Sequence, residues 1–394
     1  MKDFPFIIIG LFVIAAIFAD DFVFKVLYLL TGIYLFARLW SARSIGGVRY
    51  VRRFPERVFC GEDIPVQIDL ANSSLLPILW LRLQESVPTE IAPANPLKQV
   101  ISLGPRGLAH FDYIMKARKR GYYTVGPLFA STGDLFGIGG EQRTEGGVDH
   151  LTVYPRIINL TDLKMPSHSP MGTLRHHQPV FEDPSRTMGK REYKTGDSLR
   201  RVDWKATAAT GHLQVKQFEP SMALTTAIFL NLNEEELSRT ARIDAVELAI
   251  VVAASLANWM VAKKQTIGLI TNGLDPLTEN QPFNPLAPRK GRGHLMRILD
   301  ILARVQPCQN GQFISLLRDA SLHLTWGTTL ILITGHADNA LFDHIFRLRQ
   351  SGFNVVLILI GQTPDIGDAR ARGQKFGFPV YHFRNELDLD LWRQ

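Results

Sequence analysis

The chain has 394 residues, a hydrophobic content of 46% and a formal net charge of +7. That length is sufficient for two or three domains with separate hydrophobic cores. Its two cysteines, Cys60 and Cys308, lie far apart in the sequence, which favours reduced thiols over a disulfide framework. The basic excess does not predict nucleic-acid binding, because the sequence lacks zinc-finger spacing, an RNP-type aromatic pattern and a helix-turn-helix.

The N-terminus carries two apolar runs. Phe4–Ala19 contains no charged residue, and Lys25 is the one charged residue within Phe22–Ala37. Each run is somewhat shorter than the ~20 residues that a membrane-spanning helix usually needs, but flanking residues can lengthen both. A secretory signal peptide fits poorly, because a second apolar run follows at once and no small-x-small cleavage site precedes a polar start. We predict a transmembrane helical hairpin over residues 1–40 with Asp20–Asp21 in its turn; a buried soluble hairpin is the alternative.

The charges after the second run predict the orientation of this hairpin. Six arginines follow it against a single acid, Glu56: Arg38, Arg43, Arg49, Arg52, Arg53 and Arg57. The positive-inside rule places this segment and everything after it in the cytoplasm, and Lys2 places the N-terminus on the same side. Anionic lipid headgroups are sufficient to explain this basic cluster.

Residues 48–156 have the pattern of a β domain. Val66, Ile68 and Leu70 alternate with polar residues, and residues 79–83 alternate in the same way. Short runs of this kind are separated by turn sequences such as Gly104-Pro-Arg-Gly107. This spacing predicts an antiparallel sandwich of the immunoglobulin-like or fibronectin-like type.

Residues 157–224 form the predicted connector. Its first part, residues 157–187, has weak periodicity, and its histidines lack metal-ligand spacing: His168, His176 and His177. In its second part we expect a tight turn at 194–197, a helix over Leu199–Ala209 capped by Ser198 or Asp197, and an alternating strand over His212–Phe218.

Three interpretations of this second part stay open. Arg200 lies at a spacing that allows stacking on Trp204 and pairing with Asp203, so the set could be a buried polar latch against the following domain. The second interpretation is a phosphate- or carboxylate-binding surface formed by the basic residues: Lys190, Arg191, Lys194, Arg200, Arg201 and Lys205. Catalysis around Asp203 is the third and least favoured, because no serine or cysteine has a histidine base and an orienting acid at recognisable spacing.

From residue 225 to residue 394 the pattern alternates between strand and helix. Strands are predicted at 227–232, 266–271, 330–334, 354–360 and 380–383, and helices at 241–264, 294–305, 312–322 and 339–350. This alternation predicts a doubly wound α/β domain. The sequence has neither a GxxxxGK[ST] loop nor a GxGxxG loop after a strand, so nucleotide binding is not expected.

The stretch from Arg191 to Glu219, REYKTGDSLRRVDWKATAATGHLQVKQFE, resembles the signature of the bacterial domain-of-unknown-function 58 family. The matching positions include Tyr193, Gly196, Asp197, Arg200, Arg201, Asp203, Trp204 and Lys205. The resemblance implies a von Willebrand factor A-like fold for 225–394 and a place in the bacterial cytoplasmic (inner) membrane. It also implies a MoxR-type AAA+ ATPase as partner, with a transglutaminase-like membrane protein as a possible second partner.

A metal-competent von Willebrand factor A domain presents an Asp-x-Ser-x-Ser loop after its first strand, with a threonine and an aspartate from later loops. At those positions this chain has Asn231, Asn233 and Glu235, while the later loops offer Thr334 and Asp338. Neutral amides offset the dehydration of Mg²⁺ less well than carboxylates do. We therefore expect no cofactor and a protein-binding sheet edge that also includes Glu234; the alternative is a rebuilt magnesium site using residues 234–236 and Asp338.

Taken together, the sequence predicts a membrane-anchored binding or scaffold protein with its soluble domains in the cytoplasm and with no catalytic residues. A metal-dependent enzyme or adhesion module at the edge of the α/β sheet is the first alternative. A polyanion binder that uses the basic clusters is the second.

Overall fold

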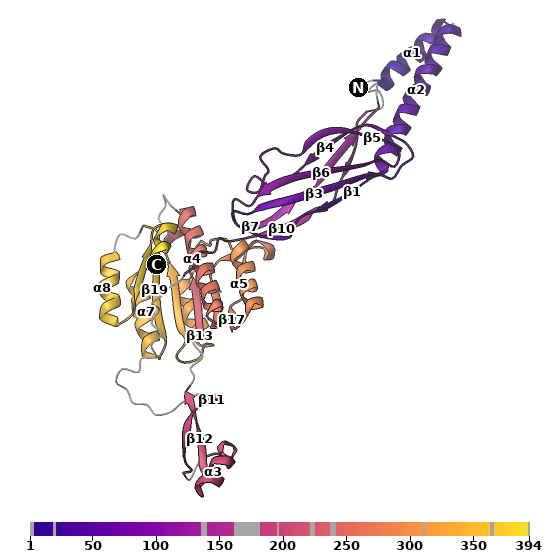
Figure 1. Ribbon diagram of the computed structural model, residues 1–394. Coiled ribbons are helices and arrows are strands. Elements are labelled where there is room, and N and C mark those ends of the chain that lie inside the picture. Colours follow the sequence, from indigo (N-terminus) through magenta and orange to yellow (C-terminus); the bar gives the residue numbers. More distant parts are fainter. Residues whose placement is uncertain are drawn as a thin grey trace. The chain divides into compact units, whose positions relative to one another are not determined.

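The structure is a computed structural model that describes residues 4–18, 21–134, 140–160, 182–194, 197–220, 225–236, 242–309, 312–362 and 366–392. Some residues singled out above lie outside the described residues: Asp20, His168, His176, His177 and Gly196. Contacts divide the chain into an N-terminal unit, residues 1–157 with 275–279 and 299–305, and a C-terminal unit that holds the remainder. Figure 1 labels the elements of both units.

The chain begins with two apolar helices, α1 (Phe4–Phe18) and α2 (Asp21–Gly46). By length and composition α2 could cross a membrane; residues 243–262 meet the same criterion, but 72% of that window is buried, as in the core helix of a soluble protein. α2 continues beyond the predicted end of the hairpin at residue 40, because its last turns bury Ser41, Ser44 and Ile45. These turns pack against strands of the β region that follows.

The β region forms three sheets in the N-terminal unit, with strand orders β1-β3-β6, β2-β10-β7 and β5-β4-β8-β9. Buried and exposed residues alternate along β3, which brings Ile64, Val66, Ile68 and Leu70 into one hydrophobic core. The strands are β1 (Val48–Arg53), β2 (Arg57–Phe59), β3 (Asp63–Asn72), β4 (Ile78–Glu85), β5 (Lys98–Leu103), β6 (Leu108–Lys116), β7 (Gly121–Val125), β8 (Leu128–Thr132), β9 (Gln142–Glu145) and β10 (Asp149–Tyr154).

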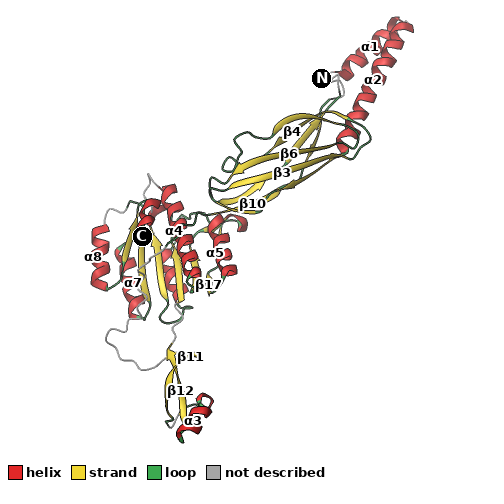
Figure 2. Cartoon of the chain, viewed as in Figure 1, coloured by secondary structure: helices red, strands yellow, loops and turns green. Residues whose placement is uncertain are grey.

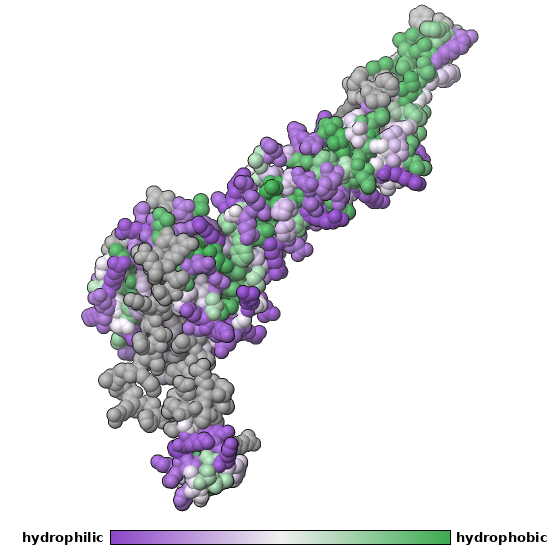
Figure 3. All heavy atoms as spheres, viewed as in Figure 1, coloured by the Kyte–Doolittle hydropathy of each residue, from purple (hydrophilic) through white to green (hydrophobic). Residues whose placement is uncertain are grey.

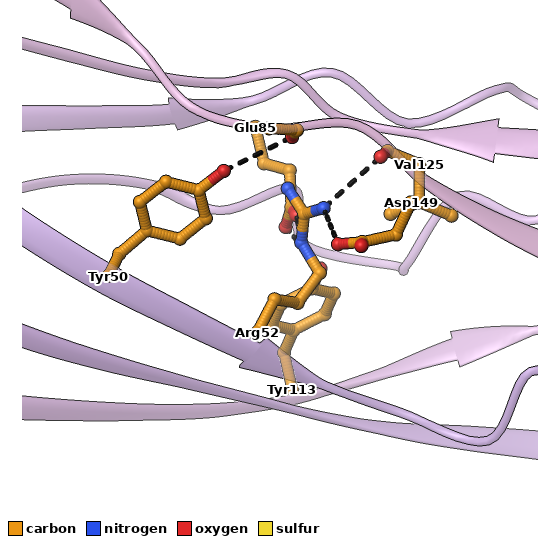
Figure 4. A network of polar contacts seen from close by, with 7 residues as sticks. Tyr50, Arg52, Glu85, Tyr113, Val125 and Asp149 are labelled. Atoms are coloured by element: carbon orange, nitrogen blue, oxygen red, sulfur yellow. Dashed lines mark hydrogen bonds and ion pairs between the residues drawn. The ribbon is translucent and has the colours of Figure 1, made fainter.

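A buried ion pair crosses the core of this unit (Figure 4). Arg52 Nε lies 2.7 Å from Glu85 Oε1, and both side chains are 1% exposed. Arg52 Nη1 also lies 2.6 Å from Asp149 Oδ2 and donates to the carbonyl of Val125 at 3.1 Å. Tyr113 donates its hydroxyl hydrogen to the other oxygen of Glu85. Burial and the neighbouring carboxylate raise the pKa of Tyr113, so the hydroxyl keeps the proton that it donates.

The predicted connector contains a β-hairpin, β11 (Glu182–Glu192) and β12 (Gln214–Pro220), so the irregular structure expected up to residue 187 is wrong from residue 182 onward. Between the two strands, the single helix expected over Leu199–Ala209 is replaced by a 3-10 turn, η1 (Leu199–Arg201), and a short helix, α3 (Trp204–Thr210). The break has a physical cause: Val202 adopts an extended conformation and forms a β-bridge with Val215.

The C-terminal unit is built on a six-stranded sheet with the order β17-β14-β13-β18-β19-β20. All neighbouring strands are parallel except β17, which pairs antiparallel with β14. The strands are β13 (Thr225–Leu230), β14 (Thr266–Thr271), β15 (Leu274–Asp275), β16 (Gln281–Pro282), β17 (Leu286–Arg289), β18 (Thr329–Thr334), β19 (Asn354–Ile360) and β20 (Val380–Phe383). β15 and β16 pair with each other outside the main sheet.

Helices pack against this sheet. Figure 2 shows the helices in red. Side chains of α6, α7 and α8 share a hydrophobic cluster with alternate residues of the central strands, including Phe229, Leu332 and Leu357. The helical elements are η2 (Glu234–Glu236), α4 (Arg242–Ala262), η3 (Pro276–Thr278), α5 (Arg292–Arg304), α6 (Phe313–Ser321), α7 (Asn339–Gln350), α8 (Ile366–Phe376) and η4 (Glu386–Trp392). The coarse prediction of apolar N-terminal helices, a β region and an α/β region is confirmed.

Candidate functional site

The candidate site lies where β13 and β18 end side by side. In chain order the parallel strands of the sheet run 2-1-3-4-5, so the order reverses between β13 and β18. Ligands of open α/β sheets bind outside the carboxyl ends of the strands at this kind of reversal. Asn231 directly follows β13, Thr334 is the last residue of β18, and η2 carries Glu236 over the same edge.

The side chains at this edge form one hydrogen-bonded network around Glu236. The amide nitrogen of Asn231 donates to Glu236 Oε2 at 2.6 Å and to the hydroxyl of Thr334 at 3.0 Å. That hydroxyl lies 3.2 Å from the same carboxylate oxygen. The amide nitrogen of Asn233 donates to Glu236 Oε1 at 3.2 Å. Asn231, Asn233 and Thr334 are all buried, so the network lies at the base of the edge.

Hydrogen bonds to the side-chain oxygen of Asn231 fix the orientation of its amide group. Its oxygen accepts hydrogen bonds from the backbone amide of Asn233 at 3.1 Å and from the side chain of Asn272 at 2.7 Å. The oxygen of Asn272 in turn accepts from the backbone amide of Leu232 at 2.8 Å. If the Asn231 amide were rotated by 180°, its NH₂ group would face the N–H donors of Asn233 and Asn272. Its oxygen would then face the carboxylate of Glu236. An NH₂ group therefore faces Glu236.

A pocket of about 390 Å³ opens beside this network. It is lined by polar side chains and by apolar side chains of α6 and α7: Glu236, Gln312, Phe313, Ile314, Ser315, His336, Asp338 and Leu341. Asp338 also caps α7, because its carboxylate accepts the backbone amide of Leu341 at 2.8 Å. A pocket that combines acidic, hydroxyl and apolar groups is a candidate ligand-binding site.

The structure brings some of the predicted site residues together and leaves others aside. Asn231, Asn233 and Thr334 meet in the network, and Asp338 lines the adjoining pocket. Glu234 and Glu235 are not among the residues that line the pocket. Asn272 was not predicted as a site residue, although its position directly after a predicted strand beside β13 was a usable signal.

The second group of predicted residues lies in the hairpin between β11 and β12. The guanidinium of Arg191 forms two hydrogen bonds with the carboxylate of Asp197, at 2.6 Å and 2.7 Å. The backbone amide of Lys194 donates to the same carboxylate at 2.9 Å. The Arg191 hydrogen bonds, followed by that of Lys194, lower the pKa of Asp197 from 3.8 to about 2. Directly after β11, the backbone amide of Tyr193 donates to the carbonyl of Leu213, the residue before β12, at 2.8 Å.

Asp203, rather than Ser198 or Asp197, caps the helix of this segment. Its carboxylate accepts the backbone amides of Lys205 and Ala206, both at 3.1 Å, at the N-terminus of α3. Lys190 of β11 reaches the other carboxylate oxygen at 2.9 Å, so the observed basic partner is Lys190. This pairing, followed by the hydrogen bond from Ala206, lowers the pKa of Asp203.

The described contacts of the carboxylates of Asp197 and Asp203 are therefore with other residues of the segment between residues 190 and 206. Lys190 and Arg191, which were expected in an anion-binding surface, are engaged by Asp203 and Asp197. Trp204 is 67% exposed at the start of α3. The side chain of Arg200 lies outside the described residues, while Arg201 and Lys205 are exposed.

Both groups of residues lie within a stretch, residues 189–360, that matches the sequence family described as "Protein of unknown function DUF58". Residues 189–360 therefore match the DUF58 family. The prediction made from the signature of the hairpin is thereby confirmed.

Other similarities extend beyond the DUF58 stretch. Over 240 residues, 60% of this chain, the sequence is 21% identical to an uncharacterized protein, YeaD, of Bacillus subtilis (strain 168). The match spans 58% of the length of that relative.

Two solved structures share a limited likeness with the chain. An aerotolerance-related membrane protein from Bacteroides fragilis NCTC 9343, with multiple mutations to serines, aligns with a TM-score of 0.33 and 13% identity over 43% of this chain and 94% of its own. The CARDB domain of the PF1109 protein from Pyrococcus furiosus aligns with a TM-score of 0.20 and 11% identity over 27% and 86%.

The sheet edge of the DUF58 region does not fit a magnesium ion. Mg²⁺ needs hard oxygen ligands in nearly ideal octahedral geometry. Directly after β13 the edge presents the NH₂ group of Asn231, and Asp338 is engaged as a helix cap. Among the described residues there is no group of three or more His, Cys, Asp or Glu side chains placed to hold a metal. We therefore derive no chemistry from a metal at this edge.

The ion pair between Arg191 and Asp197 in this hairpin leads to a testable prediction about pH. Because the pKa of Asp197 is lower in the folded chain than in the unfolded chain, its pairing with Arg191 contributes stability above about pH 4 and loses it as the pH falls toward about 2. We expect the NMR resonance of the Lys194 amide, which donates to this carboxylate, to titrate with a midpoint near pH 2. Asp197→Asn should abolish the titration, and a midpoint near 3.8 would contradict the bidentate pairing.

Proposed function

We propose that the chain is a membrane-anchored scaffold that binds another protein at the carboxyl edge of its six-stranded sheet. α1 and α2 form the anchor, and the soluble parts lie in the cytoplasm, as the arginines that follow the second apolar run favour. In this proposal the β region is an immunoglobulin-like sandwich and the α/β region is a von Willebrand factor A-like domain. No catalytic residues are assigned.

The observation that carries the proposal is the self-contained network at the sheet edge. Asn231, Asn233 and Thr334 satisfy the carboxylate of Glu236 with hydrogen bonds from neutral groups. Buried polar groups that satisfy one another need no ion to stabilise them. The edge can therefore keep its shape without a cofactor, and the pocket beside it is available to a partner.

The proposed partner is a MoxR-type AAA+ ATPase, with a transglutaminase-like membrane protein as a possible second. This identity comes from the resemblance to the domain-of-unknown-function 58 family, to which the ATPase is linked. We propose that this partner docks at the pocket that combines carboxylate, hydroxyl and apolar side chains from η2, α6 and α7.

Filling this pocket tests the proposal. Ser315→Arg places a long side chain in the pocket, and we expect ATPase recovery by affinity capture of the full chain from native membranes to fall ~10-fold or more. The matched control is Ser351→Arg, because Ser351 is exposed and lies beyond the C-terminus of α7. Each serine hydroxyl donates to a backbone carbonyl, at 2.8 Å for Ser315 and 3.0 Å for Ser351.

The outcomes separate the two parts of this proposal. Loss of the ATPase with Ser315→Arg and its retention with Ser351→Arg support docking at the pocket. Retention with both variants places the docking surface elsewhere, and a wild-type chain that captures no ATPase overturns the partner.

A further inference from the structure

The anchor and the β region of the N-terminal unit are fixed to one another at the end of α2. Four residues of the last turns of this helix are buried: Ala37, Ser41, Ser44 and Ile45. The indole nitrogen of Trp40 donates to the carbonyl of Pro77 at 3.3 Å, which ties the helix to the loop before β4. Gly47 closes the junction, because a Cβ atom there would lie 2.6 Å from the Cβ of Ser74.

Two loops of the β region gather around this junction. In the first, residues 73–77, both the backbone amide and the hydroxyl of Ser73 donate to the carbonyl of Gly47 at 2.8 Å. The second, residues 104–107, is joined to the first by the amide of Arg106, which donates to the carbonyl of Ser74 at 3.2 Å. The buried side chain of Asn72 donates to the carbonyls of Leu76 and Gly104, at 2.8 Å and 2.9 Å, and so connects the loops.

These loops present apolar and basic side chains to their surroundings. Leu75 is 71% exposed and Leu108, directly after the second loop, is 82% exposed. Neither loop contains an acidic residue. The exposed arginines in or near the junction are Arg38, Arg43, Arg49 and Arg106. Figure 3 shows the apolar side chains along α1 and α2 and on the adjoining part of the β region.

The helix sets the depth of these loops. Arg38 is the first charged residue after the apolar run, and with a rise of about 1.5 Å per residue Trp40 lies roughly 3 Å further along the axis. Tryptophan indoles are enriched at the level of lipid headgroups. Because this indole contacts Pro77, the first loop lies at that level whenever α2 spans a bilayer.

We propose that residues 73–77 and 104–108 contact the lipid bilayer that α2 spans. Leu75 and Leu108 enter the boundary between headgroups and acyl chains, and the arginines of the junction contact anionic headgroups. This inference rests on the proposed membrane anchor. It adds that one end of the β region is itself a membrane-binding surface.

The experiment measures the depth of single nitroxide labels on the full-length chain in nanodiscs of phosphatidylethanolamine and phosphatidylglycerol. Labels are attached to Leu75→Cys and Leu108→Cys in a Cys60→Ser/Cys308→Ala background whose fold is checked by circular dichroism. Leu29→Cys in α2 is the reference for the bilayer core. Ile114→Cys is the matched control, because Ile114 is 54% exposed on the same strand as Leu108.

Oxygen and a water-soluble nickel complex report the depth of each label. We expect the ratio of oxygen to nickel accessibility at Leu75 and Leu108 to fall between the values at Leu29 and Ile114. If the ratios at Leu75 and Leu108 equal the ratio at Ile114, the inference is overturned. If the label at Leu29 is lipid-exposed in the same experiment, the proposed anchor still stands. A water-exposed Leu29 would overturn the anchor itself. In nanodiscs of neutral phosphatidylcholine the loops should lie less deeply, and unchanged depth would overturn the part assigned to the arginines.

Discussion

Replacing Arg52 with alanine is expected to lower the free energy of unfolding of the N-terminal unit by about 3–5 kcal/mol. The side chain is 1% exposed and lies against the equally buried carboxylate of Glu85. Its removal would leave that carboxylate with Tyr113 as hydrogen-bond partner and without its cation. The measurement is denaturant-dependent hydrogen exchange of the amides of β3 and β4, which reports the stability of this unit within the full chain.

The neighbouring residue provides the control for this change. Arg53 lies 3.0 Å from Asp69, but their side chains are 65% and 41% exposed. Exposed pairs of this kind contribute below about 1 kcal/mol, so Arg53→Ala should have a small effect. Equal losses for the two variants would show that the buried ion pair is not what stabilises the unit.

Replacing Asn231 with aspartate is expected to destabilise the sheet edge and to create a response to magnesium. Asn231 is 3% exposed, and its NH₂ group lies 2.6 Å from Glu236. The substitution removes this donor and places two carboxylates against each other, which should cost about 2–4 kcal/mol at neutral pH. Two carboxylates and the hydroxyl of Thr334 are ligands that Mg²⁺ accepts, so the ion should restore part of the loss.

Thermal unfolding with and without Mg²⁺ is the measurement for this variant. The wild-type chain should be insensitive to the ion, and titration calorimetry should detect binding by the Asn231→Asp variant alone. Asn280→Asp, at an exposed position, controls for the added charge. Equal stabilisation of the wild-type chain would contradict our interpretation of the edge and would favour a metal-dependent function.

The elements of the α/β region were predictable because their strands are buried on both faces. The predicted bounds of β14, α7 and β19 agree with the structure, since continuous apolar strands and an amphipathic helix are strong signals. α8 was not predicted, because only Ala369 and Gly373 of its residues are buried. β17 was missed for another reason: its residues, LAPR, contain a proline and lie in a segment that resembles a loop.

The candidate site was predictable only in part. The ends of β13 and β18 indicated Asn231 and Thr334, because the sequence pattern places both at the carboxyl ends of apolar strands. The sequence pattern could not indicate that Glu236, rather than Glu235, contacts Asn231 and Thr334, because this contact depends on the path of η2. In the hairpin, the break at Val202 depends on a bridge with Val215, and the pairing of Lys190 with Asp203 depends on strand register.

The unbroken course of α2 has a mechanical consequence. A helix that spans a bilayer, as we propose for α2, tilts further when the hydrocarbon layer is thinner. The β region would follow this tilt because the last turns of α2 are buried against it. The nine residues of β6 extend roughly 30 Å from Leu108 to Lys116. A helix tilt of about 10° would therefore swing the far end of this strand by roughly 5 Å. The N-terminal unit would then act as a lever that converts bilayer thickness into lateral displacement at its distal end.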